Sequence, residues 1–576
     1  MISTILCCAL WKIFYDLKNR FRKLCLIILI LIMTITSSNH AIASGGYGDI
    51  GFCAGTCLVI GSLPGYIAKK ISNAIDEIKD KTGSSILIVD TETDTVTMKG
   101  GFTKTGWGKD NTIVVGNKVV MGPGYGKSVL IADISTGKVA EKGRLSEEIK
   151  WGHNSTVAVR NKVVMGRESA GSSILIIDAD AGKVIQKKGL SEAAWGYDCT
   201  AVAGNKVIMG RGYESMGRGG GSSILIIDTE KETVTEKDGL PIAWWGYNST
   251  AVVGNKVVMG PGYKGTSILI VDPETGAVTE KSGLSEEDWG YNSTVVVGNK
   301  IVMGGRTSIL IVDAESLAVV EKRGFSKAGW GSSSTAVVGN KVVMGRGDRY
   351  DASGSSILIV DTVKNTVIEK GGLSKADWGS GSTAVVGNKV VMGHSYHSAG
   401  TSILIVDVVN GTVTEKKGLS KAHWGYNSTA VVGNKVVMGR GDMYDDSGSS
   451  ILIIDPVKGT VTEKGGLPQS AWGYNSMVVA GNKVVIGPGA RESNSILIVD
   501  IEKGTVVEKG GLSEAKWGSD AIAAIGNKVV MGPGYGNSIL IVDVEKEIVT
   551  EKGGFHSDKW GRNAMAVVGN KVVMGL

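Results

Sequence analysis

From Ser85 to its last residue the chain repeats one pattern eleven times. Each unit contains Ser-Ile-Leu-Ile-Val-Asp or a close variant, then a Trp-Gly pair, then Asn-Lys-Val-Val-Met-Gly or nearly so. Residues 85–576 give an average of about 45 residues per unit, a period found both in β-propellers and in helical repeat arrays. The pattern within a unit must therefore decide between strands and helices.

Within a unit the pattern is that of short strands. Residues 268–271 (Ile-Leu-Ile-Val) form a β-branched apolar run too short for a buried helix, while residues 278–281 alternate and end in charge. Residues 249–253 and 256–259 flank Gly254-Asn255, a turn that accepts positive φ and closes an antiparallel hairpin. We therefore predict an all-β protein, a β-propeller of eleven four-stranded repeats. A parallel β-solenoid, the rival fold, has no use for such hairpins.

The unit also resembles a Kelch repeat. Residues 247–260 read Tyr-Asn-Ser-Thr-Ala-Val-Val-Gly-Asn-Lys-Val-Val-Met-Gly, and residues 267–279 read Ser-Ile-Leu-Ile-Val-Asp-Pro-Glu-Thr-Gly-Ala-Val-Thr. The resemblance implies an inner strand, a glycine-ended second strand, a variable loop, a third strand ended by Asp and an outer fourth strand. In that frame the array begins at a third strand and ends at a second, so the two ends complete one blade together. We expect one large closed ring or two rings of six plus five units, divided at the loop 346–355.

Two positions that recur in every unit are expected to be structural. A tryptophan in each unit is typical of a wedge between blades, and the Asp that ends each third strand is typical of a turn cap. The tryptophans are Trp107, Trp151, Trp195, Trp245, Trp289, Trp330, Trp378, Trp424, Trp472, Trp517 and Trp560.

Asn-x-Ser/Thr motifs begin at Asn154, Asn248, Asn292, Asn410 and Asn427, but the motif alone does not establish glycosylation.

The residues before the array predict an exported protein. Basic residues precede an apolar run of 12 from Leu24 to Ile35, and an Ala-x-Ala site ends at Ala43, which predicts a signal peptide over residues 1–43. The run is shorter than the ~20 residues of a membrane span, and an uncleaved anchor is the alternative. Residues 44–84 are an N-terminal segment with a short amphipathic helix, on which Ile67, Ile71, Ile75 and Ile78 share a face. Membrane contact is expected only through these first 84 residues, if the leader stays uncleaved.

The charge balance excludes one class of partner. The chain carries 62 Lys and Arg against 56 Asp and Glu, and five of those cations lie in the predicted leader with a single Asp. The remaining chain is close to neutral and offers no basic field to a phosphate backbone, so we do not expect a nucleic-acid partner.

Ligand binding is expected on the face that carries the loops between second and third strands, because length varies almost wholly there. The residue two positions after each Trp also varies, and an aromatic side chain there can stack on a sugar ring. The candidate ligand-binding residues are Tyr197, Tyr247 and Tyr291 at that position, and Tyr350, Tyr396 and Tyr444 in the loops.

The loops of three successive units are also rich in possible metal ligands. Neighbouring blades would bring together Asp348, Asp351, His394, His397, Asp442, Asp445 and Asp446. Their side chains suit Ca²⁺ or a transition metal. The alternative is a solvated polar rim, so the cofactor is Ca²⁺ or none.

The function that these observations favour is recognition. We interpret the chain as an exported, non-enzymatic scaffold that presents variable loops to a glycan or a protein at the cell surface. The alternative is a carbohydrate-active enzyme, because the Kelch-like propellers that the repeat resembles include sugar oxidases and a sialic-acid epimerase. Such an enzyme would use a loop-borne metal or acid/base site at His394 and His397. A packing element of an envelope layer is a third possibility.

Overall fold

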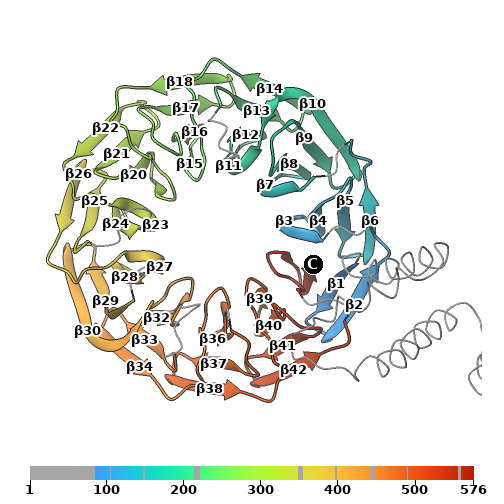
Figure 1. The fold of residues 1–576 in the computed structure, drawn as a ribbon, viewed down its shortest axis with the longest axis vertical. Coiled ribbons are helices and arrows are strands. Elements are labelled where there is room, and N and C mark those ends of the chain that lie inside the picture. The colour runs from blue at the N-terminus through green and yellow to red at the C-terminus, as the bar shows by residue number, and fades with distance from the viewer. Residues whose placement is uncertain are drawn as a thin grey trace, which may run out of the picture. The chain divides into compact units, whose positions relative to one another are not determined.

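The computed structural model describes residues 85–103, 106–146, 149–212, 221–347, 354–395, 399–441, 448–489, 491–555 and 559–576. These residues form eleven four-stranded antiparallel sheets arranged as the blades of one β-propeller around a central channel (Figure 1). The arrangement is one closed ring and not two rings of six plus five blades. The predicted leader 1–43 and the helix predicted within 44–84 lie outside the described residues. In the part of the chain that is described, no helix is long and apolar enough to cross a membrane.

Each blade runs from an innermost first strand to an outermost fourth strand, as the repeat predicts. The first strands are β3 (Trp107–Val115), β7 (Trp151–Val159), β11 (Trp195–Ala203), β15 (Thr250–Val253), β19 (Thr294–Val297), β23 (Gly329–Val338), β27 (Trp378–Val386), β31 (Thr429–Val432), β35 (Met477–Ala480), β39 (Ile522–Ile525) and β43 (Met565–Val568). The second strands are β4 (Lys118–Pro123), β8 (Lys162–Arg167), β12 (Lys206–Arg211), β16 (Lys256–Met259), β20 (Lys300–Gly304), β24 (Lys341–Gly347), β28 (Lys389–His394), β32 (Lys435–Met438), β36 (Lys483–Ile486), β40 (Lys528–Met531) and β44 (Lys571–Met574).

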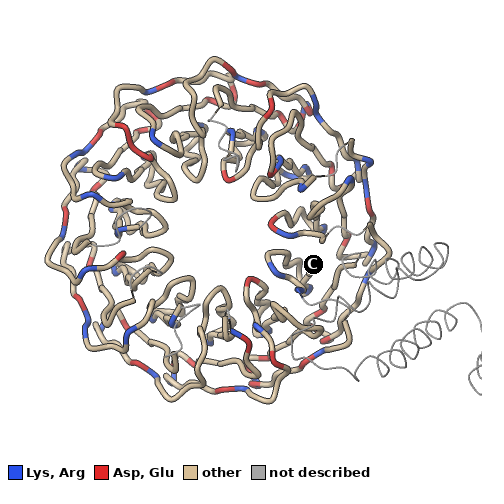
Figure 2. The backbone as a smooth tube through the Cα atoms, in the orientation of Figure 1, with Lys and Arg blue, Asp and Glu red and all other residues tan. Residues whose placement is uncertain are grey.

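The outer half of each blade consists of a buried third strand and a polar fourth strand. The third strands are β1 (Ser85–Asp90), β5 (Val129–Asp133), β9 (Gly171–Asp178), β13 (Ile224–Asp228), β17 (Ile268–Asp272), β21 (Ser308–Asp313), β25 (Ile357–Asp361), β29 (Gly400–Asp407), β33 (Ile451–Asp455), β37 (Ile496–Asp500) and β41 (Ile539–Asp543). The fourth strands are β2 (Thr95–Gly100), β6 (Lys138–Lys142), β10 (Lys183–Ala193), β14 (Thr233–Lys237), β18 (Ala277–Lys281), β22 (Val319–Arg323), β26 (Thr366–Lys370), β30 (Thr412–Ala422), β34 (Thr460–Lys464), β38 (Thr505–Lys509) and β42 (Ile548–Lys552). Charged residues of both signs follow these outer edges (Figure 2), which discourages pairing with another sheet.

The two ends of the array close the ring, as predicted. One blade has the strand order β2-β1-β44-β43, and β1 pairs antiparallel with β44 through Leu87 opposite Met574. A sheet shared between the ends of the array leaves no open blade at which the ring could separate.

Buried tryptophans lie between the blades, which confirms their predicted role. Eleven apolar clusters each combine residues of two neighbouring blades. Trp289, for example, packs with Val258 and Ile270 of the preceding blade and with Ile301 of its own. No tryptophan of a Trp-Gly pair is more than 1% exposed, so none of them is accessible to a ligand.

The Asp residues at the ends of the third strands cap turns, as predicted. Asp272 Oδ1 accepts hydrogen bonds from the backbone N–H groups of Glu274, at 3.0 Å, and Thr275, at 3.2 Å. The equivalent residue of every other blade accepts at least one such bond. These carboxylates hold the hairpins between third and fourth strands.

Candidate functional site

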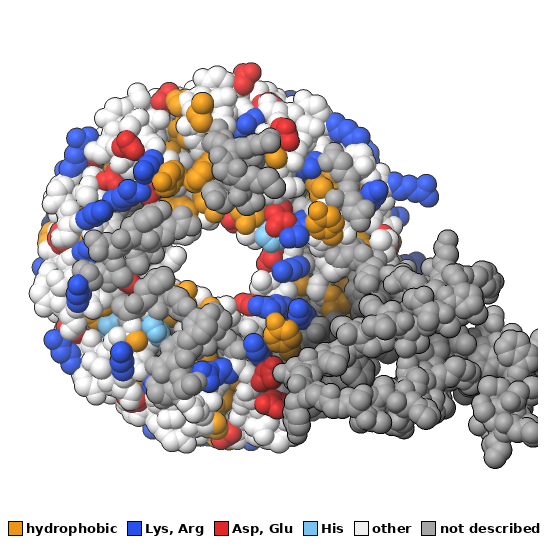
Figure 3. Space-filling model, viewed as in Figure 1, with side chains coloured by type: hydrophobic (Ala, Val, Ile, Leu, Met, Phe, Trp, Pro, Cys, Tyr) orange, Lys and Arg blue, Asp and Glu red, His pale blue; other side chains and the backbone are white. Residues whose placement is uncertain are grey.

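The loops between second and third strands lie beside the crossovers that lead into the next blade. Antiparallel bridges join Gly265 to Glu287, Gly221 to Ala243 and Gly354 to Ala376. Both kinds of connection therefore emerge on one face, called the loop face below. The face seen in Figure 3 surrounds an open channel, and hydrophobic side chains gather at its rim on the side of β15 and β16.

Backbone hydrogen bonds join neighbouring blades around the channel, at the start of the first strands. The third residue after each Trp has a positive φ, between 46° and 63°, in all eleven blades. These residues are Asp110, Asn154, Asp198, Asn248, Asn292, Ser333, Gly381, Asn427, Asn475, Asp520 and Asn563. Asn, Asp and Gly tolerate this conformation best, which explains their prevalence here.

In eight blades this left-handed residue donates a backbone hydrogen bond to its counterpart in the preceding blade. The N–H of Asn292 donates to the carbonyl oxygen of Asn248 at 2.7 Å, and seven other junctions show the same bond at 2.7–2.9 Å. We call this arrangement the rim girdle. At these eight junctions the bond also positions the residue just before, which is the variable one, at the mouth of the channel.

Four of these variable positions, on consecutive blades, carry aromatic rings in contact. His153 and Tyr197 are stacked, with ring centroids 5.7 Å apart and planes 7° apart. Tyr197 and Tyr247 are stacked at 6.5 Å, and Tyr291 continues the series 5.8 Å from Tyr247. The structure thus brings together the three tyrosines predicted at this position, half-buried rather than fully exposed. We call His153, Tyr197, Tyr247 and Tyr291 the aromatic arc.

The ionisable groups at one end of the aromatic arc interact with one another and with nearby carboxylates. Nε2 of His153 lies 3.0 Å from Oδ2 of Asp110. Burial works to raise the pKa of Asp110, but the hydrogen bond and charge of His153 hold that pKa below its usual value. Burial, reinforced by the nearby carboxylates, raises the pKa of Tyr197. Tyr197 therefore keeps its phenolic proton at neutral pH and can donate it in a hydrogen bond.

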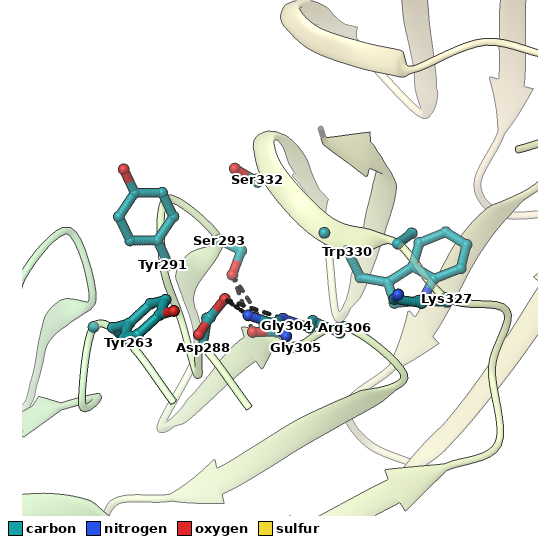
Figure 4. Close-up of a pocket in the computed structure, with 13 residues that line it drawn as sticks. Tyr263, Asp288, Tyr291, Ser293, Gly304, Gly305, Arg306, Lys327, Trp330 and Ser332 are labelled. Carbon is teal, nitrogen blue, oxygen red and sulfur yellow. Dashed lines mark hydrogen bonds and ion pairs between the residues drawn. The ribbon is translucent and has the colours of Figure 1, made fainter. Parts of the chain in front are cut away.

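A pocket opens beside the last ring of the aromatic arc, over three blades. Figure 4 shows Tyr263, Tyr291 and Asp288 on one side of it and Trp330 with Lys327 on the other. Tyr263 is 38% exposed, and its ring lies 5.3 Å from that of Trp244. The pocket thus combines an accessible aromatic surface with a few fixed polar groups, the composition usual for small-ligand sites.

The polar groups of the pocket come from the shortest loop between second and third strands, Gly304 to Thr307. Nη2 and Nε of Arg306 lie 2.9 and 3.2 Å from Oδ2 of Asp288. The buried Glu287 accepts the backbone N–H groups of Arg306, at 2.7 Å, and Thr307, at 3.0 Å. Two adjacent carboxylates thereby bind this short loop close to the end of its blade, and the pocket lies beside it.

Tyr263 and two equivalent tyrosines were not among the predicted site residues. Gly-Pro-Gly-Tyr ends the second strand in three blades and places Tyr125, Tyr263 and Tyr535 on the loop face, 59%, 38% and 38% exposed. Their common motif could have identified them, because a tyrosine that follows a Pro-Gly turn cannot continue the buried strand.

The remaining predicted site residues have different outcomes. Tyr350, Tyr396, Tyr444, Asp348, Asp351, His397, Asp442, Asp445 and Asp446 lie outside the described residues. His394 is 2% exposed, and its ring lies 4.5 Å from that of Trp378. Arg346 and Arg440 stack on the tryptophans of their own blades in the same way, so this position packs against the wedge. Among the described residues no three His, Cys, Asp or Glu side chains group as metal ligands would, and the metal site stays a prediction.

Comparison with known proteins identifies no family for this chain. No protein-family model and no curated protein matches the chain, so the resemblance to Kelch repeats is not confirmed. Similar solved structures include hydrazine synthase of Kuenenia stuttgartiensis, 12% identical over 53% of this chain and 95% of that one, with a TM-score of 0.28. Apo AztD of Citrobacter koseri is 12% identical over 72% of this chain and 98% of that one, with a TM-score of 0.34. The fold and the repeat define the protein as an eleven-bladed β-propeller.

Proposed function

We propose that the protein is an exported, non-enzymatic recognition scaffold that binds a glycan on its loop face, at the cell surface. The observation that carries this proposal is the run of four aromatic rings at one repeat position on four consecutive blades, with centroid spacings of 5.7, 6.5 and 5.8 Å. Because the scaffold repeats, a run of four aromatic side chains on neighbouring blades indicates a function specific to those blades.

The chemistry of the aromatic arc and its pocket suits sugars. A sugar ring has apolar C–H faces and a hydroxyl-bearing edge, and tyrosine offers an apolar ring and a phenolic hydroxyl together. Beside the aromatic arc the pocket adds the exposed ring of Tyr263 and the paired Asp288 and Arg306. The two charges of this pair neutralise each other, so the pair favours neither a cationic nor an anionic ligand.

The test is direct binding of the full-length protein to a glycan array, followed by variants. Tyr263→Ala and Tyr291→Ala are expected to weaken binding about tenfold or more, as for loss of a central aromatic contact. The matched control is Tyr474→Ala, since Tyr474 holds the same repeat position as Tyr291 but contacts Tyr426 outside the aromatic arc. Equal losses in all three variants, or no glycan bound by the folded protein, would contradict the proposal.

A further inference from the structure

A second cluster on the loop face is basic and lies on three blades next to those of the aromatic arc. Its centre is Tyr535, 38% exposed. Nζ of Lys516 lies 4.9 Å from the centroid of its ring and Nζ of Lys559 lies 5.3 Å from it. The two lysines belong to the crossovers into two neighbouring blades, so the ring of Tyr535 makes a cation–π contact with each of them.

Two further cations follow this cluster along the rim of the channel. Arg562 and Lys109 occupy the variable rim position in the next two blades, and the N–H of Asp110 donates to the carbonyl oxygen of Asn563 at 2.7 Å. We call Lys516, Lys559, Arg562 and Lys109 the basic arc. Figure 3 shows Lys and Arg side chains beside this part of the channel.

Two carboxylates beside the basic arc are engaged in ion pairs. Asp520 lies 3.4 Å from Nε of Arg562, and Asp110 pairs with His153. Lys516, Lys559 and Lys109 form no ion pair with any carboxylate in the described part of the chain. Three ammonium groups on one side of the channel mouth therefore attract an anion, and a lysine side chain acts there as a mobile point charge.

The two arcs form one continuous path. The basic arc ends at Lys109, and the aromatic arc begins at His153 in the following blade, so the path covers seven consecutive blades. Resting on the proposed glycan recognition, we infer that the ligand is an acidic glycan. Its sugar rings lie against the tyrosines of the aromatic arc, while its carboxylate or sulfate groups are bound by Lys516, Lys559, Arg562 and Lys109.

The test compares three polysaccharides on the full-length protein: polygalacturonate for carboxylates, heparin for sulfates and dextran as the neutral probe. At least one acidic probe is expected to bind ten times more tightly than dextran, and to weaken between 0.05 and 0.3 M salt, as screening requires. The acidic probe bound more tightly identifies the anionic group. The double variant Lys516→Gln with Lys559→Gln should lose most of this preference. Lys375→Gln, which removes an exposed lysine from a crossover outside the basic arc, should change nothing.

The outcomes separate this inference from the proposed function. Dextran bound as tightly as the acidic probes, with the lysine variant unaffected, would overturn the inference and leave glycan recognition standing. Binding of a single-stranded oligonucleotide in place of any glycan, with the same loss in the double variant, would overturn both and assign the basic arc to phosphates. Thermal unfolding of each variant shows whether a loss of binding reflects a loss of folding.

Discussion

The carbonyl oxygen of Trp330 occupies the space that a side chain on Gly304 would need. A β-carbon on Gly304 would lie closer to that oxygen than van der Waals contact allows. The glycine that follows the second-strand Met or Ile in every other blade faces the tryptophan carbonyl of the following blade in the same way. The glycine that closes each repeat is therefore required by the approach of the neighbouring blade.

Gly304→Ala is accordingly expected to destabilise the ring by about 3 kcal/mol, the upper range for forcing a group into a packed interior. Chemical unfolding of the variant measures the change. Gly510→Ala is the control, because Gly510 is exposed and the nearest atom to its added β-carbon is 3.9 Å away. A Gly304→Ala variant as stable as this control would contradict the packing argument.

Ser249→Ala is expected to raise the free energy of unfolding by about 1 kcal/mol. Oγ of Ser249 is buried without a hydrogen-bond partner among the described residues, and an unpaired buried hydroxyl is destabilising. Ala521 and Ala564 hold the same repeat position in two other blades. The contrast is Ser476→Ala: Oγ of Ser476 donates to the carbonyl oxygen of Gly487 at 3.1 Å, so its removal should lower stability. A shift of the same sign in both variants would refute this prediction.

Glu415→Gln is expected to reduce stability by about 1 kcal/mol at neutral pH and by progressively less as the pH falls below about 4, near the unfolded pKa of glutamate. Burial works to raise the pKa of Glu415, but hydrogen bonds from Ser374 and Ser402 hold it below the usual value. A lowered folded pKa stabilises the fold above the unfolded pKa, and this stabilisation is lost as the pH falls through the folded pKa. Thermal unfolding between pH 3 and 7 measures it.

The control for that experiment is Glu280→Gln. Glu280 holds the same repeat position in β18, but the crossover residue that would donate to it is Pro241, which has no N–H. Glu280 is exposed, and its substitution should leave the pH profile unchanged. Parallel changes in both variants would show that the Ser374 bond is not the cause.

Ending the chain after Val568 removes β44 and is expected to cost at least about 5 kcal/mol. Val572, Val573 and Met574 are fully buried, and each such side chain contributes about 1.5–3 kcal/mol. A synthetic peptide of residues 569–576 should restore part of the melting temperature by re-forming the pairing with β1. A truncated chain that melts like the full-length protein would show that closure contributes nothing.

The strand pattern and the shared closing blade follow from the sequence, because each rests on contacts within one repeat or between adjacent ones. Hydrophobic periodicity located the third strands, and the Gly-Asn turns located the hairpins. The choice between one ring and two did not follow, since every junction has the same chemistry and the small rotation between blades is not encoded in any one residue.

The site was predictable only in part. The variable position after Trp-Gly led to Tyr197, Tyr247 and Tyr291, but the rim girdle that aligns them depends on backbone conformation. That conformation also explains Asn154, Asn248, Asn292 and Asn427, the first residues of Asn-Ser-Thr motifs at the rim turn. The pocket was missed because it arises where a loop is short, and Glu287 holds that loop through backbone amides of residues about twenty positions later.

The pairing of β1 with β44 also sets an order for biosynthesis. As the chain leaves the ribosome, β1 and β2 appear first and form a two-stranded ribbon, which has little stability of its own. Ten further blades must be translated before β43 and β44 arrive to cover it. A chain that ends before β44 lacks the strand that pairs with β1, and an unpaired strand edge favours association with other chains. The last strand of the ring thus distinguishes a complete set of eleven blades from an incomplete one.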